Sequence, residues 1–182
     1  MKSVPLKNQE VKSKSATPLS NSLPLLRIIK IATCTSLSSR STLTYQIGCI
    51  ENSDGKVDIR FRIKSNTSRG FFSKEWISTN TIQAVFEKLP PNCAVSSMNF
   101  NGIFSGKSVN TSGFLLAVLK AEGLMARIKG KHRAYLRGKP DEFADQIERL
   151  VASSISLNDN DKPEASGNIS KKSIQTVKAK TS

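Results

Sequence analysis

The stretch SVNTSGFLLAVLKAEGLMARIKGKHRAYLRG, residues 108–138, decides the fold. Its first half is an apolar run that predicts a helix, and Gly123 is suited to end that helix in a left-handed conformation. Its second half turns at 129–131 and predicts a tight hairpin without an acidic residue. The hairpin carries Arg127, Lys129, Lys131, Arg133 and Arg137. An apolar helix joined directly to a basic hairpin favours contact with a polyanion.

Alternating residues upstream predict a small antiparallel sheet of three strands. The apolar rows are Leu43, Tyr45, Ile47 and Cys49 on one strand, and Val57, Ile59, Phe61 and Ile63 on the next. A three-residue loop at 53–55 places both rows on one face, with Ile47 opposite Phe61, whereas a two-residue loop would separate them. The stretch GFFSKEWIS, residues 70–78, predicts the third strand. The opposite face would carry a second basic row, made of Arg60, Arg62 and Lys64.

Helical spacing marks two further segments. Residues 79–89 present an apolar stripe that begins after a capping residue at 78–80 and ends at Pro90. A short helix or turn is expected within 93–104. The last helix begins near Pro140, and its acids Asp141 and Glu142 suit a positive helix end. Its stripe consists of Phe143, Ile147, Leu150, Val151 and Ile155. The whole pattern predicts an α+β fold.

Composition narrows the possible partners, cofactors and activities of the protein. The chain has 182 residues and a formal net charge of +14, which favours nucleic acid as the partner. No apolar run has the length of a membrane span, so no membrane contact is expected. Three separated cysteines and one histidine lack the paired spacing of a zinc site, so neither a metal nor another cofactor is expected. The stretch GIFSGKS, 102–108, is one residue too short for a phosphate-binding loop, and no other enzyme signature is present.

Both ends of the chain are expected to be disordered tails, over 1–42 and 157–182. The N-terminal tail holds seven basic residues and one acid, and an organelle-targeting segment or a start assigned too far upstream would look the same. Between the tails lie the predicted sheet at 43–78, a helix-and-hairpin module at 79–138 and the last helix at 139–156. The cysteine pattern is typical of a reducing compartment, which indicates a cytoplasmic protein, associated with the nucleoid in a bacterium.

Residues 79–138 resemble a winged helix-turn-helix domain. The resemblance rests on Phe114, Leu115, Val118, Leu119, Glu122, Gly123 and Leu124, followed by the hairpin 127–136. It implies that the start of the apolar helix enters a DNA groove while the hairpin lies along phosphates. The DNA-binding residues would be Lys107, Asn110, Thr111, Ser112 and Lys120 on or before the helix, and Arg127, Lys129, Lys131, His132, Arg133 and Arg137 on the hairpin. The alternatives are ordinary helix capping at 110–112 and a solvated hairpin.

The expected function is therefore binding of duplex DNA by a transcriptional regulator or an accessory factor. Two other functions stay open: a protein-interaction module, such as an adaptor or inhibitor, and an RNA-binding protein that uses the row Arg60, Arg62 and Lys64. The last helix predicts a homodimer through Phe143, Ile147, Leu150 and Val151. The alternative for this stripe is docking on the chain's own sheet.

Overall fold

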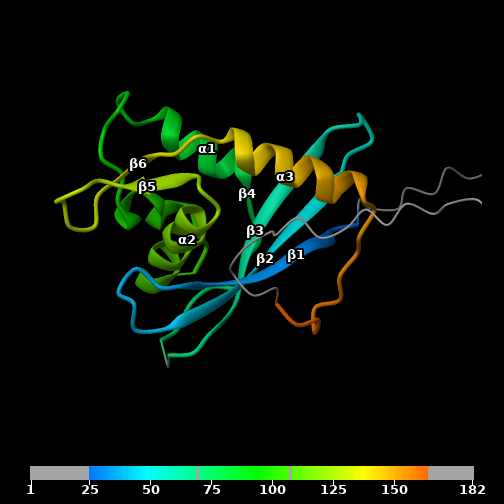
Figure 1. The fold of residues 1–182 in the computed structure, drawn as a ribbon, viewed down its shortest axis with the longest axis horizontal. Coiled ribbons are helices and arrows are strands. Elements are labelled where there is room, and N and C mark those ends of the chain that lie inside the picture. The colour runs from blue at the N-terminus through cyan, green and yellow to red at the C-terminus, as the bar shows by residue number, and fades with distance from the viewer. Residues whose placement is uncertain (1–24, 69, 107, 164–182) are drawn as a thin grey trace, which may run out of the picture.

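The computed structural model describes residues 25–68, 70–106 and 108–163, which form an α+β fold (Figure 1). Four antiparallel strands form one sheet in the order β1-β2-β3-β4. The strands are β1 (Arg27–Thr35), β2 (Thr42–Glu51), β3 (Val57–Asn66) and β4 (Ile77–Ser78). The helices are α1 (Thr79–Glu87), the 3₁₀-helix η1 (Ser97–Ile103), α2 (Val109–Ala121) and α3 (Asp141–Ala152). A separate hairpin pairs β5 (Met125–Arg127) with β6 (Tyr135–Arg137).

The β2–β3 hairpin has the predicted register. Ile47 lies opposite Phe61, and both side chains are buried on the face that the helices cover. The backbone N–H of Asn52 donates to the carbonyl of Lys56 over 2.9 Å and closes the loop 53–55. Gly55 has a φ of +79°, which a glycine adopts without steric cost. The prediction of a three-residue loop is confirmed.

The sheet has four strands and not the predicted three, because β1 lies inside the segment assigned to a disordered tail. Residues 27–35 pair along β2 and bury Ile29 and Ile31. The second tail also begins too early in the prediction, since the N–H of Leu157 donates to the carbonyl of Ile28 over 2.8 Å. Residues 1–24 and 164–182 lie outside the described part of the chain.

The predicted third strand is also mostly wrong, since only Ile77 and Ser78 pair with β3. Residues 70–76 instead form a loop that packs against the start of α2. The N–H of Ser73 donates to Oγ1 of Thr111 over 2.8 Å, and the Phe72 ring meets Phe114 edge-on at 5.9 Å. Hydrogen-bond partners on a distant helix therefore replace the strand partners expected from local alternation.

The helical predictions agree better with the structure. Ser78 caps α1, and its Oγ accepts from the N–H of Asn80 over 3.1 Å. At the end of α2, Gly123 has a φ of +76° and the N–H of Leu124 donates to the carbonyl of Leu119 over 2.9 Å. This is the left-handed cap predicted from the Glu-Gly-Leu exit. No described helix has both the length and the apolar character needed to cross a membrane.

The apolar stripe of α3 packs on the chain's own sheet, which was the alternative to a homodimer. The Phe143 ring stacks on Phe61 with 5.8 Å between ring centroids, and Ile147 is buried beside it. Leu150 and Val151 are partly buried against the same core. A homodimer through these side chains would require the core to open, so the predicted interface is already occupied within one chain.

Candidate nucleic-acid interface

The basic hairpin projects from the end of the molecule opposite the β2–β3 turn (Figure 1). Its two strands pair from Met125–Arg137 to Arg127–Tyr135, and the N–H of Ile128 bonds to the carbonyl of Ala134 over 3.0 Å. Tyr135 also exchanges two backbone hydrogen bonds with Val95, of 2.8 and 2.9 Å. Both of these side chains are buried, so they anchor the hairpin to the body.

Most basic side chains of the hairpin extend into solvent. The exposed side chains include Arg127, Lys129, Lys131, His132 and Arg133. None of these five is in an ion pair within the described residues, and the segment 124–140 contains no acid. The four Arg and Lys side chains among them therefore offer a phosphate backbone positive charge that no ion pair neutralises within the described residues.

Arg137 differs from the other hairpin cations, because its side chain folds back onto the body. Its guanidinium donates to the carbonyl of Phe86 and lies 4.7 Å from the centroid of that ring. This contact joins β6 to the end of α1. Lys120 is exposed on α2, and Lys107 lies outside the described residues.

The start of α2 does not present the three predicted base-reading residues as expected. Thr111 and Ser112 are 0% and 2% exposed. The Thr111 hydroxyl accepts from Ser73, and the Ser112 hydroxyl donates to Oδ1 of Asn101 over 2.5 Å. Asn110 is exposed, but its amide donates to the carbonyl of Phe71 over 3.0 Å. The prediction is wrong for Thr111 and Ser112, whose hydroxyls stabilise the fold.

The second basic row is largely paired within the chain. Arg60 donates to Oδ2 of Asp58 over 2.8 Å. Arg62 donates to Gln46 and Asp159 and lies 4.6 Å from the Trp76 ring centroid. The third member of the row, Lys64, is half-buried. This face therefore has less free positive charge than the hairpin.

A buried polar cluster beneath α2 was not predicted from the sequence. Lys30 Nζ lies 2.8 and 2.9 Å from the two carboxylate oxygens of Glu122, and the Tyr45 hydroxyl donates to the same carboxylate. Gln146 accepts from Lys30 over 3.3 Å. No sequence signal pairs these residues, because Lys30 stands in an apparently tail-like segment. The cluster joins β1 to the residue at which α2 ends and the hairpin begins.

Burial raises the pKa of the nearby Cys34 thiol to about 11, and the negative charge of Glu122 contributes to the same shift. Such a thiol is neutral and unreactive at ordinary pH. No group of three or more potential metal ligands occurs among the described residues. The buried polar cluster thus stabilises the end of α2 and the base of the hairpin, and the positively charged side chains are exposed on the hairpin.

Comparison with known proteins adds no further information, since no family model, curated protein or solved structure matches this chain.

Proposed function

We propose that this protein binds duplex DNA, with the exposed hairpin β5–β6 lying along the phosphate backbone. The observation that carries the proposal is a set of five exposed side chains on the hairpin, four of them Arg or Lys, that form no ion pair with any residue the structure describes. Cations of this kind supply affinity through the release of counterions from DNA, whatever the base sequence.

The order of elements supports a winged-helix arrangement for residues 79–138. Helix α1 is followed by an extended residue, Val95, then by η1, α2 and the hairpin. Val95 forms an isolated antiparallel bridge with Tyr135, which ties the hairpin to the segment before η1. In a winged helix, the hairpin lies beside the helix that approaches the groove.

The contacts at the start of α2 favour binding that depends weakly on base sequence. The hydroxyls of Thr111 and Ser112 are occupied inside the protein, and Asn110 holds the loop 70–76. Few groups remain there to read base edges, whereas the hairpin cations are free. This balance suits an accessory DNA-binding protein better than a regulator with one narrow target.

A salt series tests the proposal. Fluorescence anisotropy would follow binding of the full chain to a labelled random duplex between low and physiological salt. With about four to five phosphate contacts, the logarithm of affinity should fall with the logarithm of salt concentration at a slope of about −4. Replacing Lys129, Lys131 and Arg133 together with Ala should reduce the steepness of that slope by about 2 to 3.

The matched control removes three exposed cations from elsewhere: Lys56, Arg149 and Lys162, all replaced by Ala. Lys56 belongs to the β2–β3 turn at the end opposite the hairpin (Figure 1). The control has the same net charge as the hairpin variant and should keep most of the slope. Equal effects of the two variants would show that only net charge matters and would reject the hairpin as the interface. Tighter binding of single-stranded RNA than of duplex DNA would favour the RNA alternative.

A further inference from the structure

The one histidine of the chain, His132, lies at the tip of the basic hairpin. The two strands pair as far as Arg127 and Tyr135. Within the connecting loop, the backbone N–H of Lys131 donates to the carbonyl of Ile128 over 3.2 Å. His132 follows this turn, and its side chain is exposed to solvent. The imidazole therefore belongs to the same exposed surface as the cations that are proposed to contact phosphates.

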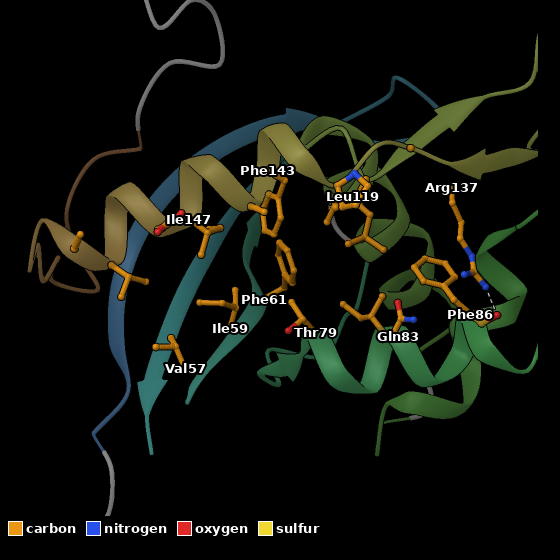
Figure 2. Close-up of a pocket in the computed structure, with 18 residues that line it drawn as sticks. Val57, Ile59, Phe61, Thr79, Gln83, Phe86, Leu119, Arg137, Phe143 and Ile147 are labelled. Atoms are coloured by element: carbon orange, nitrogen blue, oxygen red, sulfur yellow. Dashed lines mark hydrogen bonds between the residues drawn. The ribbon is translucent and has the colours of Figure 1, made fainter. Parts of the chain in front are cut away.

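The base of the hairpin is fixed to the body of the protein, and its tip extends away from the body (Figure 1). At the base, Arg137 donates to the carbonyl of Phe86 and lies over that ring, as Figure 2 shows. The elements that adjoin the hairpin are the end of α1, the segment before η1, the end of α2 and the start of α3, and their ionisable groups are Glu87, Lys88, Cys93, Lys120, Glu122, Lys139, Asp141 and Glu142. Within the described residues, none of these groups forms a hydrogen bond or an ion pair with residues 129–133, so no bonded carboxylate offsets a positive charge at the tip.

Protonation of His132 would add one positive charge to the tip of the hairpin. Histidine is the residue whose ordinary titration lies between about pH 5 and 8. His132 stands between Lys131 and Arg133 in the chain. Like charges disfavour the protonated form of an imidazole, whereas phosphate oxygens beside it favour that form. DNA that binds the hairpin therefore favours the uptake of a proton by His132.

We propose that His132 makes the binding of DNA by the hairpin dependent on pH, with affinity rising as the pH falls from about 7.5 to about 5.5. This inference rests on the proposed function, because it concerns the same hairpin and the same phosphates. Its sign follows from linkage: the complex holds more protons than the free protein, so a higher proton concentration favours the complex. The protonated imidazole acts as one further phosphate contact and releases about one further counterion from the DNA.

Fluorescence anisotropy of the full chain with a labelled random duplex tests this dependence. The affinity is measured over a salt series at about pH 7.5 and again at about pH 5.5. One further phosphate contact steepens the salt slope by about 0.9, which corresponds to about fivefold in affinity near physiological salt. The wild-type chain should therefore bind the duplex about three- to fivefold more tightly at the lower pH, with a slope that is steeper by about 1.

Two substitutions at the same position serve as matched references. The side chain stays neutral over this pH range in His132→Gln and stays charged in His132→Lys, and every other titrating group of the chain is kept. The Gln variant should bind like the wild type at the higher pH and lose most of the tightening at the lower pH. The Lys variant should bind at both pH values as tightly as the wild type does at the lower pH. Circular dichroism melting would verify that both variants fold, as expected at an exposed position.

The possible outcomes separate this inference from the proposed function. If the wild-type chain binds duplex DNA with the same pH dependence as His132→Gln, the role of His132 is refuted and the proposed function stands. A tightening at the lower pH without a steeper salt slope would also overturn the inference, because no further counterion would then be released. If the wild-type chain binds no duplex DNA at either pH, both proposals are rejected.

Discussion

The buried pair of Lys30 and Glu122 should be one of the most sensitive points of the fold. The two side chains are 12% and 2% exposed, and Lys30 Nζ lies within 2.9 Å of both carboxylate oxygens. Lys30→Met keeps the length of the aliphatic stem and removes only the ammonium. The carboxylate then stays buried, with the Tyr45 hydroxyl still donating to it. We expect the free energy of unfolding to fall by about 3 to 5 kcal/mol, the usual cost of leaving one charge of a buried pair unpaired.

The double variant separates the pair from its surroundings. Lys30→Met combined with Glu122→Met removes both charges together, and with them the carboxylate oxygen that accepts from the Tyr45 hydroxyl. Losing that one hydrogen bond costs less than burying an unpaired carboxylate, so the double variant should be more stable than Lys30→Met alone. The Glu122→Met variant alone completes the comparison. The loss of unfolding free energy in the double variant, compared with the sum of the losses in Lys30→Met and Glu122→Met, gives the coupling energy between the two side chains. We expect this coupling energy to be at least about 2 kcal/mol.

Urea unfolding followed by circular dichroism at neutral pH would give these energies. The control is Lys56→Met, which breaks the exposed pair with Asp54 at 3.2 Å and should leave stability close to wild type. If Lys30→Met is no more destabilising than Lys56→Met, the inference that β1 is held to the end of α2 by this pair is refuted.

Three other changes test further features of the structure. A fragment of residues 25–163 should unfold cooperatively, whereas a fragment of 43–156 should not fold because it lacks β1; circular dichroism melting distinguishes them, and a folded 43–156 would restore the tail boundary predicted from composition. The pKa of the Cys34 thiol is raised from 9.0 to about 11, so the folded state favours the neutral thiol, and the stability it contributes below pH 9 should be lost as the pH rises from about 9 to 11. That loss is on the order of 2 kcal/mol, and Cys34→Ala should show a smaller decline over the same range in urea titrations. Gly138→Ala would bring a methyl group to 2.0 Å from the Gly123 carbonyl oxygen and should destabilise the hairpin base, whereas Gly113→Ala in α2 meets nothing within 4 Å and should stabilise the protein by about 0.5 to 1 kcal/mol. Equal melting temperatures for the two glycine variants would contradict the close approach at Gly138.

The sequence alone was enough to predict the strands, helix ends and turns that are determined by residues close to one another in the chain. The alternation on both sides of Gly55 specified the register of β2 and β3, because a slip of one residue would turn every apolar side chain to the other face. The Ser78 cap and the Gly123 exit bounded α1 and α2 for a similar reason, since each satisfies backbone groups within one helical turn. The basic hairpin also followed from its turn residues and its lack of acids.

Tertiary contacts decided what the local patterns left undetermined. Lys30 interrupts an apolar run and so weakens the strand signal of β1, but Glu122, far along the chain, makes the buried lysine favourable. Thr111 has the residue type of a base-reading group, yet the N–H of Ser73 occupies its hydroxyl. The α3 stripe is compatible with a dimer or an intrachain core, and Phe61 is the partner that places Phe143 in the core. In each case, the deciding group is remote in sequence, and periodicity describes only which side a residue faces, not what it meets there.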